Sequence, residues 1–247
     1  MANISAAAPA APGDFRIGDV FSKTATLLSR NFLTFFVVAV VAGLPRLLWA
    51  DVETQDAANF PFGRFFGGLS LILLLNTLAQ AIILYGAFQA MRGRPVNIGE
   101  CLKVGLSRFF PIIGLIICAY FAIWLGLMLF VVPGLILGIM WYVATPVCVV
   151  EQKGPLASLG RSSELTKGHR WKIFGMVVLL YIAALVIGLV IGGVLGLTQS
   201  PVLVKLGTLV WTGAWGAFYA IFGVVTYHDL RVAKEGVDTD QIASVFD

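Results

Sequence analysis

The chain has 247 residues, of which 59% are hydrophobic and only 12% are charged, whereas globular chains average about 45–50% apolar and about 25% charged residues. This composition excludes an ordinary soluble domain, and the length leaves room for one helical membrane bundle. The formal net charge of +4 does not indicate a nucleic-acid partner, because the basic residues lie beside apolar stretches, where anionic lipid headgroups are nearer.

The first fourteen residues are rich in Ala and Pro, and they contain neither a positively charged start nor a sustained apolar run. These features predict a flexible tail over residues 1–14 rather than a signal peptide. We expect the membrane domain to occupy residues 15–231 and a cytoplasmic C-terminal tail to occupy residues 232–247.

Six apolar runs poor in charge follow one another along the chain, and each is long enough to cross a bilayer. The first is disturbed near its end by Pro45, and the second carries the polar residues Asn76 and Gln80. A tight turn at Val132-Pro133-Gly134 is expected to start the fourth and shortest span, which ends near Val150. The other expected spans are 32–48, 65–91, 110–132, 171–197 and 206–226.

The polar stretches that precede the first, third and fifth spans have features of helices lying at the membrane interface. Residues 17–30 place Ile17, Val20, Phe21, Thr24 and Leu28 on one side of a helix. In the second stretch Asn97 and Glu100 have the spacing of a capping box, followed by an apolar face of Ile98, Cys101, Leu102, Leu106 and Phe109. In the third, Pro155 suits a first helical turn and Gly168 suits a stop, around a mixed face of Leu156, Leu159, Ser163 and Thr166.

The first two of these stretches share sequence, which predicts an internal repeat. Ile17-Gly18-Asp19 through Arg30 corresponds to Ile98-Gly99-Glu100 through Arg108, and the third copy is more degenerate. The predicted fold is therefore all-α and polytopic, with six transmembrane helices in three units of one interfacial helix and one hairpin. Because all three units cross the membrane in the same sense, they differ from the inverted repeats of many transporters.

The distribution of the seventeen Lys and Arg residues predicts the orientation of the spans. Lys and Arg are retained in short cytoplasmic loops, and most of these residues lie in the N-terminal stretch, the second and fourth loops and the C-terminal stretch. Only Arg46, Arg64 and Lys205 fall on the other side. We therefore expect both termini in the cytoplasm.

A family resemblance begins near the end of the fourth span and continues through the loop that follows it. It is carried by Pro146, Glu151, Gly154, Arg161-Ser162, Lys167-Gly168 and Trp171. This segment resembles that of YciC-like bacterial inner-membrane proteins, and it is also similar to the membrane domain attached to some glycerophosphodiester phosphodiesterases. The resemblance implies a protein of the bacterial cytoplasmic (inner) membrane. The phosphodiesterase activity belongs to a separate barrel domain that this chain has no length to encode, so we do not expect that activity here.

The densest basic region of the chain lies in the same segment and is the candidate contact for an anionic lipid headgroup or a protein partner. Its members are Arg161, Lys167, His169, Arg170 and Lys172. Basic residues flanking a span are also ordinary membrane anchors, and that interpretation is the more general one. Glu151 is expected to form a structural ion pair with Arg161, or with Lys167, rather than a proton relay.

Gly188, Gly192 and Gly196 recur at every fourth position of the fifth span, a spacing that lets another helix approach closely. Packing within the chain is the favoured explanation, and a homo-oligomer or another membrane protein is the alternative.

No catalytic, cofactor or metal signature is readable: His169 and His228 lack the spacing of a zinc site, and no GxSxG is present. We therefore expect a non-catalytic membrane protein that acts as a scaffold, an accessory subunit or a lipid-interacting factor, with no cofactor. A small-solute transporter or channel is the alternative, suggested by Asn76, Gln80 and Pro146. A lipid-modifying intramembrane enzyme ranks last, and it requires a pocket that converges on Glu151, His169 and Arg170.

Overall fold

The fold of the protein is helical throughout the part of the chain that the structure describes. The computed structural model describes residues 15–49 and 62–236, and no strand occurs within them. Six helical segments of these residues are long and apolar enough to cross a membrane, which confirms the predicted all-α, multi-pass architecture. The predicted tail at 1–14, and residues 237–247 of the predicted C-terminal tail, lie outside the described residues.

Between residues 15–49 and again between residues 62–236, the helices follow one another with short connections. Pro45 begins a new short helix, as expected for a residue that cannot continue the preceding one, and Asn31 has non-helical dihedrals (φ −122°, ψ 21°) where the predicted interfacial helix enters the first span. The helices are α1 (Ile17–Gly43), α2 (Pro45–Trp49), α3 (Phe62–Met91), α4 (Ile98–Leu129), α5 (Val131–Met140), α6 (Ala144–Val150), α7 (Pro155–Thr166), α8 (Arg170–Leu197) and α9 (Pro201–Glu235).

The start of α4 follows the predicted cap in part. The Asn97 side chain accepts hydrogen bonds from the backbone N–H groups of Gly99 and Glu100, at 3.0 and 3.3 Å. Glu100 does not complete a reciprocal box, because its carboxylate accepts a hydrogen bond from the hydroxyl of Tyr85 on α3 instead. The helix then continues without interruption through Pro111 to Leu129, so the predicted interfacial segment and the third span form one helix.

The turn between the third and fourth spans differs from the prediction. It consists of the single residue Phe130, which is extended (φ −158°, ψ 146°) between α4 and α5. Pro133 lies in the first turn of α5, where its missing N–H leaves no hydrogen bond unmade. Gly134 is the point of closest approach, because a Cβ built there would lie 2.4 Å from the Leu127 side chain.

The fourth span is two helices rather than one. α5 ends at Met140 and α6 begins at Ala144, and a break within a membrane requires new partners for the freed backbone groups. Those partners come from α7: the Met140 carbonyl accepts hydrogen bonds from Ser162 Oγ at 2.8 Å and Thr166 Oγ1 at 3.2 Å. The segment between the fourth and fifth spans therefore packs against the break and supplies hydrogen-bond donors to it.

The buried face of α7 also differs from the predicted mixed face. Leu156 is 73% exposed, and Ser163 is only partly buried. The buried residues are Ser158, Leu159, Ser162, Leu165 and Thr166. The prediction placed Leu156 on the buried side because its side chain is apolar. The residues of α7 that contact the broken span are instead the small hydroxyl residues.

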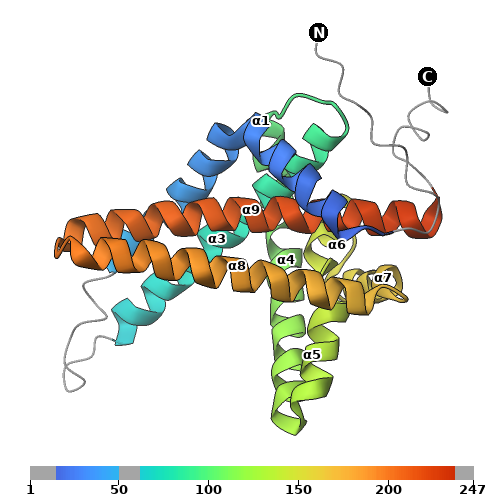
Figure 1. The fold of residues 1–247 in the computed structure, drawn as a ribbon. Coiled ribbons are helices and arrows are strands. Elements are labelled where there is room, and N and C mark those ends of the chain that lie inside the picture. Colours follow the sequence, from blue (N-terminus) through green and yellow to red (C-terminus); the bar gives the residue numbers. More distant parts are fainter. Residues whose placement is uncertain (1–14, 50–61, 237–247) are drawn as a thin grey trace.

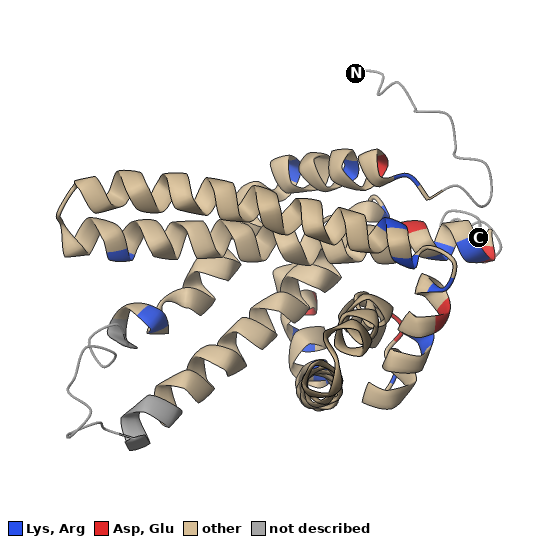
Figure 2. Ribbon diagram, turned by 60° about the horizontal axis from the view of Figure 1, so that its bottom comes forward, with Lys and Arg blue, Asp and Glu red and all other residues tan. Residues whose placement is uncertain are grey.

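Two helical hairpins diverge from the end of the molecule that carries α6 and α7. α4 and α5 form one hairpin, α8 and α9 form the other, and they point in different directions (Figure 1). The core lies along the second half of α9, where Ile221, Phe222 and Val225 are fully buried. Charged residues gather around α7, the start of α1 and the end of α9 (Figure 2), the regions that the sequence predicts on one side of the membrane.

The close contact at Gly134 predicts the outcome of a glycine scan along α5. Gly134→Ala places a Cβ against Leu127 and should lower the free energy of unfolding in detergent by about 1–3 kcal/mol. Gly138→Ala is the matched control, because a Cβ there meets nothing within 4 Å and alanine is the better helix former. Equal stability of the two variants would show that Gly134 and Leu127 are not in close contact.

Candidate functional site

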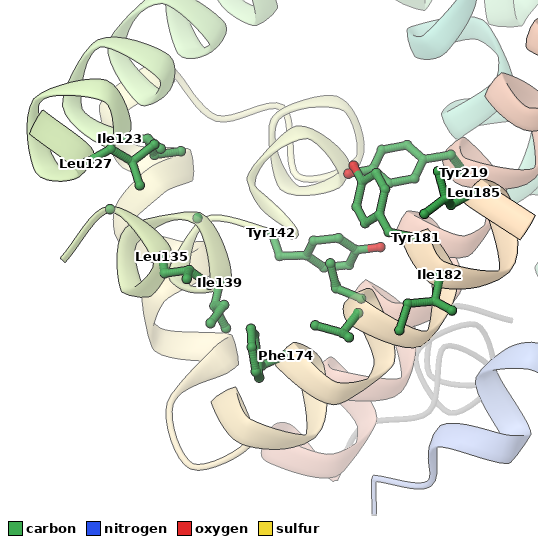
Figure 3. A pocket seen from close by; sticks show the side chains of 14 residues that line it. Ile123, Leu127, Leu135, Ile139, Tyr142, Phe174, Tyr181, Ile182, Leu185 and Tyr219 are labelled. Carbon is green, nitrogen blue, oxygen red and sulfur yellow. The ribbon is translucent and has the colours of Figure 1, made fainter. Parts of the chain in front are cut away.

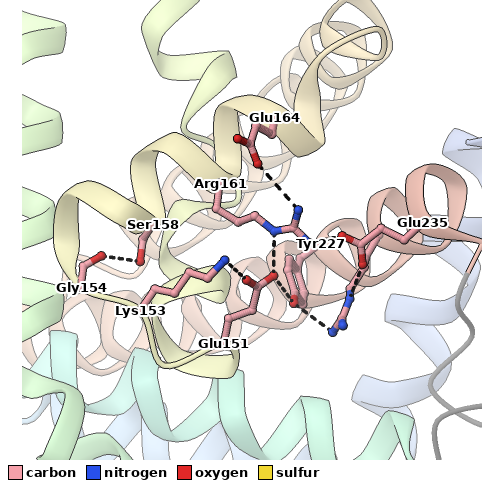
Figure 4. Close-up of polar contacts among 9 residues, drawn as sticks. Glu151, Lys153, Gly154, Ser158, Arg161, Glu164, Tyr227 and Glu235 are labelled. Carbon is pink, nitrogen blue, oxygen red and sulfur yellow. Dashed lines mark hydrogen bonds and ion pairs between the residues drawn. The ribbon is translucent and has the colours of Figure 1, made fainter.

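Glu151 directly follows α6 and is contacted by three other side chains (Figure 4). Its Oε1 accepts a hydrogen bond from Arg161 Nε at 3.2 Å and another from the Tyr227 hydroxyl at 2.9 Å. Its Oε2 pairs with Lys153 Nζ at 2.8 Å. Both carboxylate oxygens are therefore engaged by the protein itself, and Lys167, the other predicted partner, is not among the groups that engage them.

The same network continues to the end of α9. The Arg161 guanidinium also pairs with Glu235, whose other carboxylate oxygen accepts a hydrogen bond from Arg231 Nε at 2.9 Å. We call Glu151, Lys153, Arg161, Tyr227, Arg231 and Glu235 the collar cluster. It joins the loop after α6 to α7, the next helix, and to α9, which is far away in sequence. The sequence analysis missed its α9 members, although Tyr227, Arg231 and Glu235 recur at the i, i+4 spacing of one helix face.

The charges of the collar cluster stabilise one another. Burial alone would raise the pKa of Glu151, but hydrogen bonds from Lys153, Tyr227 and Arg161 outweigh it and hold that pKa below its ordinary value. Burial likewise opposes the charge of Arg161, while its bonds to Glu235 and Glu151 raise its pKa. Glu151 is therefore an ionised structural carboxylate that the surrounding cations hold in place.

The other basic residues of the predicted headgroup site have different surroundings. Lys172 Nζ donates a hydrogen bond to the Phe15 carbonyl at 3.1 Å, and the His169 ring packs edge-on against the Phe15 ring with centroids 5.8 Å apart. Lys167 is exposed. Arg170 lines a small cavity of about 200 Å³ with Ile136, Ile139 and Trp171. The five residues thus do not form one binding site, although Arg170 and Lys167 remain placed to contact lipid.

The three spaced glycines of α8 also have different surroundings. A Cβ built at Gly188 would lie 3.5 Å from the Trp211 indole of α9, whereas Gly192 and Gly196 have nothing within 4 Å. Packing within the chain therefore explains Gly188 and does not explain the other two. The tight contact between α8 and α9 is made instead by Leu195 against Gly207, a pair that the glycine spacing does not reveal.

A cavity of about 550 Å³ lies where the two hairpins diverge (Figure 3). We call it the inter-hairpin groove. No Asp, Glu, Lys or Arg is among the described residues that line it, which are Ile123, Leu127, Gly134, Leu135, Gly138, Ile139, Tyr142, Phe174, Val177, Val178, Tyr181, Ile182, Leu185 and Tyr219. Among the described lining residues, only the three tyrosines have polar side chains, and they were not predicted because an isolated tyrosine in an apolar span resembles ordinary packing.

A second cavity, of about 270 Å³, lies on the other side of Tyr142 and Tyr219, which line both. It is lined by the predicted polar residues of α3. Asn76 Nδ2 donates to the Ile72 carbonyl within its own helix at 2.8 Å, and Gln80 Nε2 donates to the Gly216 carbonyl of α9 at 3.3 Å. Interhelical hydrogen bonding thus explains Gln80 and does not explain Asn76. We call this second space the polar cavity.

Comparison with known proteins supports the resemblance found in the sequence. Residues 112–222 match the family model of the membrane domain of glycerophosphoryl diester phosphodiesterase. The match includes Glu151, Arg161 and all three tyrosines of the inter-hairpin groove, while the α9 members of the collar cluster lie beyond it. The YciC-like part of the resemblance stays a prediction. No curated protein and no solved structure matches the chain significantly.

The collar cluster predicts an acid-sensitive contribution to stability. The pKa of Glu151 is lower in the folded state than its ordinary 4.5, so its contribution is complete above that value and is lost as the pH falls through the folded-state pKa. Glu151→Gln should lower the free energy of unfolding by about 1–3 kcal/mol at neutral pH.

The same substitution should remove part of the loss of stability on acidification. Denaturation in detergent across a range of pH measures both effects. Glu164→Gln is the matched control, because Glu164 is 73% exposed and lies 3.8 Å from Arg161, so the expected loss is about 0.5 kcal/mol or less. Similar losses in the two variants would contradict the central role of Glu151.

Proposed function

We propose that the chain is a non-catalytic, lipid-interacting membrane protein that receives the apolar chain of a membrane lipid in the inter-hairpin groove. The observation that carries the proposal is the cavity between the diverging hairpins, which is within the size range of about 300–1,000 Å³ that is common for ligand sites. A multi-pass membrane protein has lipid around its spans, so a lipid chain is the molecule nearest to this groove.

The exposure of the lining residues supports access from the bilayer. Ile182 and Leu185 of α8 are 53% and 61% exposed although they line the groove. Lipid tails are as apolar as these side chains, so no hydrophobic force draws the two hairpins together. A lipid chain between them supplies the close contacts that a void would lack.

The non-catalytic part of the proposal is supported by the engagement of Glu151. A general acid or base has to reach the reacting group, and both oxygens of this carboxylate face Arg161, Tyr227 and Lys153. The pocket that an enzyme would need, converging on Glu151, His169 and Arg170, is replaced by separate surroundings for each of the three.

Anionic lipids are the proposed partners at the membrane surface, where Lys167 is exposed and Trp171 is 85% exposed beside Arg170. The proposed location is the bacterial inner membrane, with both termini in the cytoplasm. The grouping of charged residues around α7, the start of α1 and the end of α9 (Figure 2) supports this orientation.

A small-solute transporter is the second candidate, and the polar cavity favours it. Asn76 and Tyr142 each lie near the middle of a span, so this cavity brings hydrogen-bonding groups to the depth that a transported solute has to cross. The Tyr142 and Tyr219 rings lie between the polar cavity and the groove, because both residues line both spaces. Transport would therefore require these two rings to move apart.

Filling the groove tests the proposed function. Gly138 lines the groove, and a Cβ there meets nothing within 4 Å, so the indole of Gly138→Trp should occupy the groove without disturbing the backbone. We expect labelling of groove peptides by a phosphatidylcholine with a photoreactive acyl chain to fall to about a tenth of the wild-type level, because close-packed space excludes the chain.

Gly192→Trp is the matched control, since Gly192 is equally open and lies outside the groove. It should leave labelling of the groove peptides unchanged. Labelling that is the same in both tryptophan variants would overturn the proposal.

The orientation is tested separately with a reporter enzyme that is active only outside the cytoplasm. Fused after Val132, between the third and fourth spans, the reporter should be active, and fused to Asp247 it should be inactive. Activity at the C-terminal fusion would reverse the assignment.

A further inference from the structure

Tyr142 has a buried hydroxyl whose hydrogen-bonding capacity is unused. Its Oη is inaccessible to solvent and has no hydrogen-bond partner among the described residues. The other two tyrosines of the groove, Tyr181 and Tyr219, differ because their hydroxyls face each other (Figure 3). A buried hydroxyl without a partner is costly, so one that persists requires an explanation.

The position of Tyr142 directs this hydroxyl to the groove. The residue lies in the break between α5 and α6, which frees it from the regular helix. Its ring meets the Tyr219 ring edge-on, with centroids 6.3 Å apart, and its oxygen points toward α8 near Ile182 (Figure 3). A molecule at the deep end of the groove would therefore reach the Tyr142 hydroxyl after a side-chain shift beside it, because this oxygen has no accessible surface in the empty groove.

Water is a poor partner at this point. A buried water needs two to four polar contacts, whereas the described lining of the groove offers no polar side chain besides the three tyrosines, two of which face each other (Figure 3). A ligand that carries one hydrogen-bonding group on an otherwise apolar body satisfies the Tyr142 hydroxyl without needing further polar contacts.

The uncharged lining of the groove and the depth of Tyr142 in the membrane indicate which headgroup this ligand can carry. A charged group near the middle of a span needs a compensating charge, and the described lining holds none. A phosphate at the membrane surface would lie near Arg170. Tyr181, which lies beside Tyr142 in Figure 3, is about 16 Å from Arg170 along α8 at 1.5 Å per residue. The headgroup of a phospholipid anchored at Arg170 therefore lies too far away to bond Tyr142.

We infer that the inter-hairpin groove is a site for an uncharged single-chain lipid with a hydroxyl head, whose chain lies between the hairpins and whose head hydrogen-bonds Tyr142. This inference rests on the proposed function and specifies its ligand. Tyr142 is the specificity-determining residue, because it distinguishes a lipid with a polar head at this depth from a plain hydrocarbon chain.

The experiment compares two photoreactive probes, 1-hexadecanol and hexadecane, each carrying a diazirine at the same carbon. They are added at equal mole fraction to phosphatidylcholine vesicles that contain the full-length protein. In the wild type, the alcohol should label the groove peptides of α5 and α8 about three- to tenfold more than the hydrocarbon, the ratio expected for one net hydrogen bond.

Tyr142→Phe should abolish this preference and keep the labelling by hexadecane. It should also keep the melting temperature of the empty protein, since the hydroxyl it removes has no partner there. Tyr120→Phe is the matched control, because Tyr120 lines the polar cavity and does not line the groove. It should retain the wild-type preference.

Three results would overturn the inference, and they separate it from the proposed function. Equal labelling of the groove by both probes in the wild type would refute the hydroxyl site and leave lipid binding intact. A lower melting temperature of Tyr142→Phe would reveal an internal partner for the hydroxyl. Failure of both probes, and of the photoreactive phosphatidylcholine, to label the groove would refute lipid binding as well.

Discussion

Glu151 holds together helices that the membrane itself does not drive together. Its contacts with Arg161, Tyr227 and Lys153 join α7 and α9 to the loop after α6, and Arg108 of α4 donates hydrogen bonds to the neighbouring Gln152. In lipid, two apolar hairpins gain little from closing on each other, and these polar contacts link α4 to α9 through the loop after α6. The inter-hairpin groove is the space that this arrangement leaves open.

The broken fourth span depends on the same region. Splitting the span frees the Met140 carbonyl, and the hydroxyls of Ser162 and Thr166 satisfy it from the helix that Arg161 attaches to Glu151. The break in turn releases Tyr142 from a regular helix and lets its ring separate the groove from the polar cavity. The collar cluster, the broken span and the lining of the groove are therefore connected by direct contacts.

Much of the fold could be predicted from the sequence, because length, hydropathy and caps are local properties. The six spans, the start of α2 at Pro45 and the cap at Asn97 follow from residues that are close together in the chain. The break after Met140 was not predictable in this way, since averaged hydropathy is the same for one helix and for two. The groove depends on the angle between the hairpins, and no local pattern encodes that angle. The glycine spacing likewise did not reveal that Gly192 and Gly196 lack a neighbour within this chain, and their contact with another protein stays a prediction.

We propose that lipid fills the space between hairpins that are joined by polar contacts at one end. An electron cryo-microscopy map of the protein in phosphatidylcholine nanodiscs would show whether this is so. We expect diverging α4–α5 and α8–α9 hairpins with an elongated density between them that reaches Tyr142. If instead α8 packs against α5 along its length and side chains fill the groove, lipid does not occupy this space.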